Sequence, residues 1–313
     1  MPIEGLRKRN CKRDGQTEYE DVGNSSWWTS QPHLVSAHER SLYVHQGEIG
    51  YGISGDQYDV VGSDDATTCF IVLARHRKSG HLLAAHVDTE ARAETVGRHI
   101  DSLTDSNIDD RTVDIYISGG IVYIKDSVDT LAVLLESIQG CSSDCHLRLL
   151  NFEKNCGEAG LSVNASSKLP RPIVLGCGFI IKGKDVSVVP MKFPLSARGP
   201  LAHHRQALML TTDEPKVVYQ SNCNRLLISP AWSELRNLDK DTRDYFRDSL
   251  SLPDDAFIEQ WSTSPHCEPP HFISEMRSTL LYIVSERNDS LLSPDIINGA
   301  SFQLQQNEWV MVC

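Results

Sequence analysis

The 313-residue chain has no apolar run that approaches the roughly 20 residues needed to span a bilayer, so we expect no membrane-spanning helix. Its first residues, Met1–Glu4, lack the apolar centre of a secretory signal. Nine cysteines without such a signal indicate reduced thiols in a cytoplasmic or nuclear compartment. Disulfides are therefore not expected. Neither a P-loop nor a dinucleotide fingerprint occurs, so the sequence gives no sign of a nucleotide cofactor.

Positive charge is scarce, and the formal net charge is −12. Nucleic-acid binding depends on clustered lysine and arginine, so we expect no nucleic-acid partner. An acidic protein is instead suited to a cationic peptide terminus. One basic cluster, Arg7–Arg9 followed by Lys12–Arg13, is either a nuclear localisation patch or a solvated tail.

The pattern of hydrophobic residues predicts an α+β fold. Residues 1–40 are polar and are expected to form an N-terminal arm, whereas residues 41–313 are expected to form a single domain. Strand-like runs dominate the middle of the chain, and apolar residues at helical spacing predict helices around 128–138 and 272–283. We therefore expect a largely antiparallel, sandwich-like β core flanked by helices.

One predicted hairpin carries candidate chemistry. The apolar run Phe70–Ala74 follows Cys69, a second run, Leu82–Ala85, ends at His86, and the turn-like segment Arg77–Gly80 lies between them. If the hairpin is centred between residues 77 and 78, Cys69 and His86 face each other across the ladder. Directly opposed residues have Cβ atoms about 4.5–5.5 Å apart, which brings a thiol and an imidazole within reach of a shared proton.

Such a pair is suited to acyl transfer. A cysteine attacks a carbonyl carbon as its thiolate, and an adjacent imidazole is expected to lower the thiol pKa from about 8.5. Cys69 is then the nucleophile, and His86 is the base that later donates its proton to a leaving amine. Amide or ester substrates fit this chemistry best. The alternative is that Cys69 is an ordinary small core residue.

Two blocks of sequence closely resemble the protein N-terminal asparagine amidohydrolases. The first is Gly62–Cys69, and the second is Ser262–Phe272 with the nearby Arg277–Leu280. The resemblance implies that Cys69 is the nucleophile and that the protein hydrolyses the side-chain carboxamide of an N-terminal asparagine. The products would be an N-terminal aspartate and ammonia, and the reaction would feed the arginine branch of the N-degron pathway.

A looser likeness supports the same chemistry. His86 follows Cys69 by seventeen residues, and this separation is similar to that in the bacterial chemoreceptor glutamine deamidases. The likeness is limited to this pair and to a following Gly-Gly turn, here Gly119–Gly120. It implies a fold like that of the Cys-His deamidases.

An amidase also needs a group that orients its base and donors that bind the oxyanion. Ser63 and Asp88 are the two candidates for orienting His86, and the sequence does not decide between them. The backbone N–H groups of Thr68 and Cys69 and the hydroxyl groups of Thr67 and Thr68 are candidate oxyanion donors. We expect the reaction to need neither a metal nor an organic cofactor.

Recognition of a free amine demands a carboxylate, because an unpaired buried ammonium group costs several kcal/mol. The carboxylates nearest in sequence are those of Asp64, Asp65 and Glu268. An equal alternative for Asp64 and Asp65 is that they cap the turn before the cysteine. Two prolines precede the second predicted helix, so the block around them should form a rigid wall. Ser264 or His271 could reach the substrate from it, unless His271 is only a first-turn helix residue.

Three other interpretations stay open at this stage. The protein could deamidate internal glutamine or asparagine, or it could be a non-catalytic module that reads N-terminal asparagine. Cys141, Cys145 and His146, with Cys156, have a spacing that permits zinc, although a second clean pair of ligands is missing. We favour a monomeric thiol amidohydrolase acting on proteins or peptides that begin with asparagine.

Overall fold

The computed structural model describes most of the chain, in segments separated by short gaps. The described residues are 8–9, 18–19, 31–36, 38–53, 58–104, 110–121, 124–153, 175–210, 215–220, 225–228, 238–262, 265, 268–285, 300–305 and 308–312. Among them, no helix is long and apolar enough to cross a bilayer.

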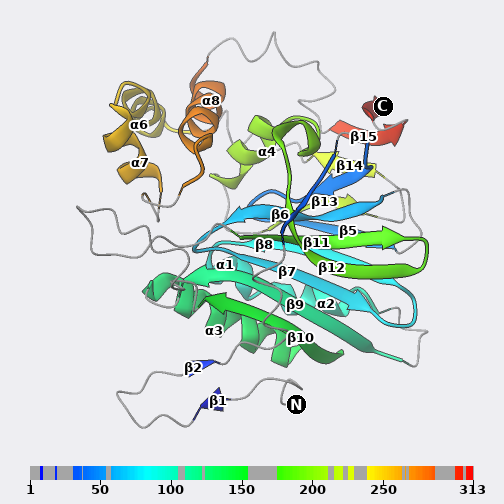
Figure 1. Cartoon of the computed structure of the whole chain (residues 1–313). Helices are drawn as coiled ribbons and strands as arrows, with labels where there is room; N and C mark the ends of the chain where they lie inside the picture. Colours follow the sequence, from blue (N-terminus) through cyan, green and yellow to red (C-terminus); the bar gives the residue numbers. More distant parts are fainter. Residues whose placement is uncertain are drawn as a thin grey trace.

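Two mixed sheets form the centre of the molecule (Figure 1). The nine-stranded sheet has the order β10-β9-β7-β8-β5-β13-β14-β15-β16. Its strands, in that order, are Asp144–Glu153, Thr112–Ile121, Phe70–His76, His81–Val87, Glu48–Ile53, Lys216–Gln220, Arg225–Ile228, Ala300–Gln305 and Glu308–Val312. The five-stranded sheet has the order β3-β12-β11-β6-β4. Its strands are His33–Leu34, Asp185–Lys192, Leu175–Lys182, Val60–Ala66 and Ser41–Tyr43. Two short strands, β1 (Lys8–Arg9) and β2 (Glu18–Tyr19), pair separately.

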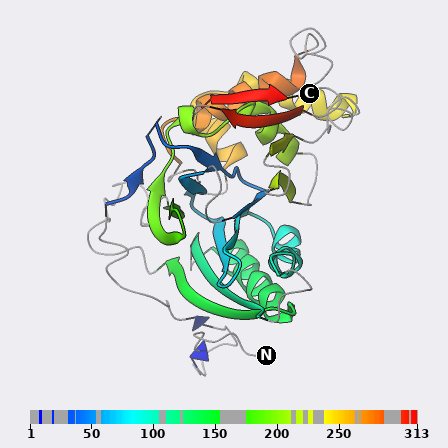
Figure 2. The same cartoon turned by 90° about the vertical axis from the view of Figure 1, so that its right-hand side faces the viewer.

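The helices form two groups, which Figures 1 and 2 show on opposite sides of the molecule. The first group consists of α1 (Glu90–Ala93), α2 (Val96–Asp101) and α3 (Lys125–Gly140). The second group, called the helical layer below, consists of α4 (Ala202–Met209), α6 (Lys240–Leu250), α7 (Asp254–Trp261) and α8 (Phe272–Val284). A 3-10 turn at Leu195–Ala197 precedes α4. The expected α+β class is confirmed, and so are the helices predicted around 128–138 and 272–283.

Both sheets contain parallel as well as antiparallel neighbours. The pairs β9–β10, β5–β13, β4–β6 and β3–β12 are parallel, and the other pairs of the two sheets are antiparallel. Strand β3 places residues 33–34 in the five-stranded sheet, beside β12. The division into an arm and a single domain stays a prediction.

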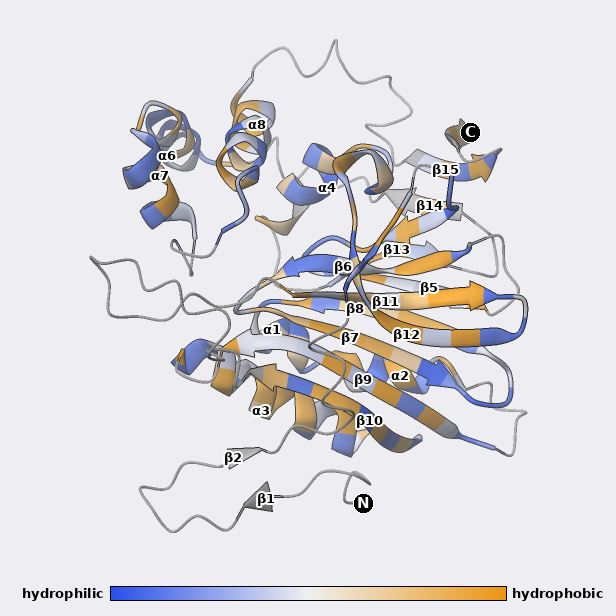
Figure 3. Ribbon diagram, in the orientation of Figure 1, coloured by the Kyte–Doolittle hydropathy of each residue, from blue (hydrophilic) through white to orange (hydrophobic). Residues whose placement is uncertain are grey.

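Alternating side chains on the hairpin β7–β8 supply two cores. Phe70, Val72 and Ala74 pack with α1–α3 in one buried cluster, because every second residue of a strand faces the same side. Ile71 and Leu73 face the other way and pack with residues of β6 and β11 in a second cluster. Figure 3 shows hydrophobic residues concentrated along these central strands and on α3. The side of the hairpin that faces the five-stranded sheet also carries the candidate site.

The register of this hairpin corrects the sequence-based prediction. Ile71, and not Cys69, is directly opposite His86. The turn Arg77–Gly80 has four residues, and Gly80 donates its N–H to the carbonyl oxygen of His76 at 3.0 Å. The pairing is therefore displaced by two residues from the predicted one. Because strand side chains alternate with a period of two, this displacement keeps Cys69 and His86 on the same face as diagonal neighbours.

Candidate functional site

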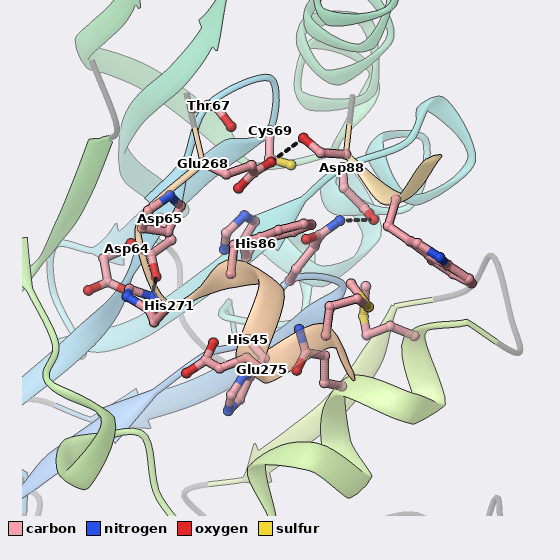
Figure 4. A pocket seen from close by; sticks show the side chains of 18 of the residues that line it. His45, Asp64, Asp65, Thr67, Cys69, His86, Asp88, Glu268, His271 and Glu275 are labelled. Carbon is pink, nitrogen blue, oxygen red and sulfur yellow. Dashed lines mark hydrogen bonds and ion pairs between the residues drawn. The ribbon is translucent and has the colours of Figure 1, made fainter. Parts of the chain in front are cut away.

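A cavity of about 230 Å³ opens between the hairpin β7–β8 and the helical layer (Figure 4). On this scale one water molecule needs about 10–15 Å³, so the cavity accommodates an amino-acid-sized group. Of the predicted site residues, nine line it: Asp64, Asp65, Thr67, Thr68, Cys69, His86, Asp88, Glu268 and His271. Ser63 lies behind His86, and Ser264 lies outside the described residues. The fold thus brings together residues that are 200 positions apart in sequence.

The backbone around Cys69 is fixed from behind by β9 and α3. Gly120 donates its N–H to the carbonyl oxygen of Cys69 at 2.9 Å, and the Ser127 hydroxyl donates to the carbonyl oxygen of Thr68 at 2.7 Å. Gly119 has φ 126°, and a Cβ atom there would lie 2.2 Å from the Cys69 carbonyl oxygen. Only glycine allows this close approach, so the predicted Gly-Gly turn is a support for the cysteine.

His86 is held in one tautomer by Ser63. The Ser63 hydroxyl lies 2.6 Å from the carbonyl oxygen of Val44 and 2.8 Å from Nδ1 of His86. A carbonyl can only accept, so the single hydroxyl proton of Ser63 is donated to Val44. The Ser63 oxygen must then accept from Nδ1–H of His86, which leaves the lone pair on Nε2. Among the described residues Nε2 has no hydrogen-bond partner, although it is buried.

Asp88, the other candidate for orienting His86, makes different contacts. Its carboxylate accepts from Arg92 at 2.5 Å and from Gln46 Nε2 at 2.8 Å. Nδ1 of His86 is instead bound to Ser63, and Nε2 has no hydrogen-bond partner among the described residues.

The pKa shifts of Cys69 and His86 differ from those expected for a thiolate–imidazolium pair. Burial raises the pKa of the Cys69 thiol, and the negative charges of Asp88 and Glu268 raise it further, whereas a hydrogen bond from Thr68 opposes them. Burial also lowers the pKa of His86 to about 4, against the attraction of Asp88 and Asp65. The expectation of a lowered thiol pKa is therefore wrong for the free protein, which holds a neutral thiol beside a neutral imidazole at pH 7.

Asp64 and Asp65 belong to a charged cluster around Arg198. Asp64 accepts from the Tyr43 hydroxyl at 2.9 Å, from the Phe193 N–H at 2.6 Å and from Arg198 at 3.2 Å. Asp65 adopts φ 56°, a left-handed conformation that aspartate tolerates better than most residues. Burial and the neighbouring charge of Asp65 raise the pKa of Asp64 to about 6. The cluster closes one end of the cavity.

The same cluster joins the strands to the helical layer. His271, just before α8, places Nε2 3.0 Å from the carboxylate of Asp65, and Arg198 donates to Asp65 and contacts Glu275 of α8 at 3.5 Å. His271 thus lines the cavity from the residue just before α8, and its contact with a substrate stays a prediction. At the other end of the cavity, the Ser262 hydroxyl donates to Glu268, which lies beside Cys69 (Figure 4).

Three residues of the site were missed by reasoning from sequence. Arg198, Glu275 and His45 all line the cavity. His45 is 8% exposed, and its Nε2 has no partner among the described residues. Burial lowers the pKa of His45 well below its usual value, and Arg205 and Arg198 lower it further. Each residue lies in a segment without a recognisable motif, so only the fold could reveal it.

The cysteines considered for zinc lie away from this cavity, at the end of α3 and the start of β10. The sulfur atoms of Cys141 and Cys145 are 3.3 Å apart, and His146 contacts Asp144 at 3.2 Å. Cys156 lies outside the described residues. No group of three possible metal-ligating side chains occurs in the part of the chain that the structure describes.

Comparison with known proteins identifies the family of this chain. A family model described as protein N-terminal asparagine amidohydrolase matches residues 31–310. Proteins of that name from Sus scrofa and Homo sapiens are 29% and 28% identical to this chain over 248 residues, which cover 77% of this chain and 74% of each relative. A protein of the same name from Arabidopsis thaliana is 23% identical over 271 residues, covering 80% of this chain and 74% of the relative. The chain therefore belongs to the protein N-terminal asparagine amidohydrolase family and is an amidohydrolase.

Proposed function

We propose that this protein hydrolyses the side-chain carboxamide of an N-terminal asparagine in proteins or peptides, with Cys69 as nucleophile and His86 as base. The observation that carries the proposal is the tautomer of His86. Its Nδ1–H is committed to Ser63, so the lone pair of Nε2 is available in the cavity that Cys69 lines. The family supplies the substrate class, because its named members are N-terminal asparagine amidohydrolases.

In the first half-reaction Nε2 of His86 takes the thiol proton of Cys69 while the sulfur attacks the carboxamide carbon. A neutral imidazole with a pKa of about 4 is suited to accept this proton only as the C–S bond forms, since the free thiol is not ionised. The tetrahedral intermediate then collapses, the imidazolium protonates the departing nitrogen, and ammonia leaves a thioester on Cys69. In the second half, His86 deprotonates a water molecule that attacks the thioester. The C–S bond breaks, the sulfur regains a proton, and the product is an N-terminal aspartate.

The oxyanion requires a donor on the cavity side of the cysteine. The described peptide bonds are trans, so the N–H of Cys69 points away from the carbonyl of Thr68 in the same peptide unit. That carbonyl is directed at Ser127 of α3. The Cys69 N–H therefore points away from the helix, and we propose it as a donor to the oxyanion, with the Thr68 side chain beside the sulfur.

Glu268 is the carboxylate that we assign to the substrate ammonium group. It lies beside Cys69 and is held by Ser262, whereas Asp64 and Asp65 are engaged with Arg198. In asparagine only Cα and Cβ separate the amine from the carboxamide carbon, so the ammonium group must bind close to the nucleophile. Its charge would also offset the effect of Glu268 on the thiol. An internal glutamine or asparagine has no charge to place there, which favours the N-terminal reaction over the internal one.

Mass analysis of a peptide that begins with asparagine tests the activity. The expected result is a gain of about one dalton with the wild-type protein and none with Cys69→Ser. An acetylated peptide should not react, and its reaction would establish the internal deamidase instead. Binding without any conversion would establish a non-catalytic reader. Glu268→Gln should raise KM about tenfold or more, the size of a lost charged hydrogen bond, whereas Glu275→Gln serves as the matched change on another cavity carboxylate.

The remaining expectations extend this proposal. The product would enter the arginine branch of the N-degron pathway, and the protein would act as a monomer in the cytoplasm and the nucleus. We further propose that the two sheets form a sandwich of the Cys-His deamidase type. The buried cluster that β6 and β11 share with β7 and β8 supports this arrangement.

A further inference from the structure

The cavity has an apolar lining that the hydrolysis itself does not use. The lining comes from the helical layer and is called the apolar wall below. It consists of Met209 and Leu210 at the end of α4, Trp261 at the end of α7, and Phe272 and Met276 on α8. Figure 4 shows the end of α4 reaching the cavity from the side opposite Cys69.

Contacts outside the cavity hold the apolar wall in place. Arg92, which also binds Asp88, donates to the carbonyl oxygen of Met209 at 3.1 Å. The Met209 side chain lies against Gly47, where a Cβ atom would be 2.1 Å from its sulfur. Trp261 packs against Phe246 with ring centroids 5.6 Å apart. The wall is thus anchored to α1, to the residue before β5 and to α6.

The apolar wall lies on the path by which a bound peptide must leave. One end of the cavity is closed by four buried residues, Tyr43, His45, Asp64 and Arg198. The exposed lining residues are Gln46 and Leu210, and Leu210 is 39% exposed. A substrate whose first residue occupies the space between Cys69 and His86 therefore extends toward Gln46 and Leu210, past the wall.

We propose that the apolar wall binds the side chain of the second substrate residue, and that the protein prefers a large apolar residue there. This inference rests on the proposed function, because the occupant is the continuation of the same peptide. The two methionines are flexible and adapt to side chains of different shape, so leucine and phenylalanine should both be accepted. Aspartate should be disfavoured, because five carboxylates already line the cavity: Asp64, Asp65, Asp88, Glu268 and Glu275.

A peptide series that differs only in its second residue tests the proposal. Four peptides begin Asn-Leu, Asn-Phe, Asn-Gly and Asn-Asp and share one sequence thereafter. The expected kcat/KM is about tenfold higher for the leucine and phenylalanine peptides than for the glycine peptide, corresponding to partial burial of one apolar side chain. The aspartate peptide should be the poorest. Equal values for the leucine and glycine peptides would overturn the proposal.

A variant pair then locates the effect on the wall. Leu210→Ser should lower kcat/KM several-fold more for the leucine peptide than for the glycine peptide. Leu281→Ser is the matched control, because Leu281 is 58% exposed on α8 and is not part of the cavity lining. Equal slowing of both peptides by Leu210→Ser would contradict a second-residue site.

Binding of the same peptides to Cys69→Ala, measured by calorimetry, separates this inference from the proposed activity. Tighter binding of the leucine peptide than of the glycine peptide supports the apolar wall even if no peptide is hydrolysed by the wild-type protein. Absence of hydrolysis would remove the proposed function. Equal binding together with normal hydrolysis would remove only the second-residue site.

Discussion

Replacing Ser63 with alanine removes one oxygen atom, and that atom decides which nitrogen of His86 carries the proton. The Ser63 oxygen accepts from Nδ1 at 2.8 Å and donates to Val44 at 2.6 Å. Without it, the imidazole loses the contact that keeps Nε2 unprotonated and directed into the cavity. A single hydrogen bond contributes about 0.5–1.5 kcal/mol net, and each 1.36 kcal/mol is tenfold in rate. We expect kcat/KM to fall about 2- to 13-fold.

The variant should also be less stable, which calls for a control. Two buried polar groups lose their partner, and each unsatisfied group costs about 1–3 kcal/mol. Ser249→Ala is a matched change, because the Ser249 hydroxyl is buried, donates to the Tyr245 carbonyl and accepts from Gln260 in the helical layer. It should lower the melting temperature without a comparable loss of activity.

The assay is ammonia release from an asparagine-initiated peptide, measured well below the melting temperature of each variant. If Ser63→Ala and Ser249→Ala lose stability to a similar degree but keep the same kcat/KM, the tautomer argument is refuted. The base would then be oriented by something other than Ser63.

Three further predictions follow from the same site. The rate of Cys69 alkylation by iodoacetamide should increase with pH and reach its midpoint above pH 8.5, because burial raises the thiol pKa. A rate that is already maximal at pH 6 would instead show a thiolate–imidazolium ion pair. The value of kcat/KM should stay constant as the pH falls to about 5 and should decline near pH 4, where the imidazole of His86 gains a proton. A decline centred near pH 6 would indicate that protonation of Asp64 controls the activity. Gly119→Ala should abolish soluble folding or activity, since the new methyl group would collide with the Cys69 carbonyl, whereas Gly140→Ala meets no atom within 4 Å and should behave as wild type in thermal melts and turnover.

The sequence predicted that Cys69 and His86 share one face of the hairpin, but not the register of its two strands. The hairpin was recognised from two apolar runs, and its turn was placed between residues 77 and 78. The ring of His76 contacts the Ser79 hydroxyl at 2.6 Å and Gly80 has φ 74°, which fixes a four-residue turn instead. An error of two residues preserved the face, whereas an error of one would have moved His86 into the core beneath α1–α3.

Long-range burial explains what the sequence could not predict. The thiol pKa was expected to fall because a histidine lies near Cys69, but the direction depends on desolvation and on Glu268, about 200 residues away. Arg198 likewise meets Asp64 only after the chain has completed the five-stranded sheet. Local patterns predicted a nucleophile, a base and two candidate partners for the base, and in the structure His86 contacts Ser63 whereas Asp88 pairs with Arg92.

The two walls of the cavity have separate origins along the chain. The thiol and the imidazole come from one short hairpin, whereas Met209, Trp261 and Met276 come from helices encoded more than 100 residues later. Substitutions in those helices can therefore change which substrates are accepted without altering the thiol and the imidazole. Divergence in substrate choice within the family should accumulate in the later segment of the gene.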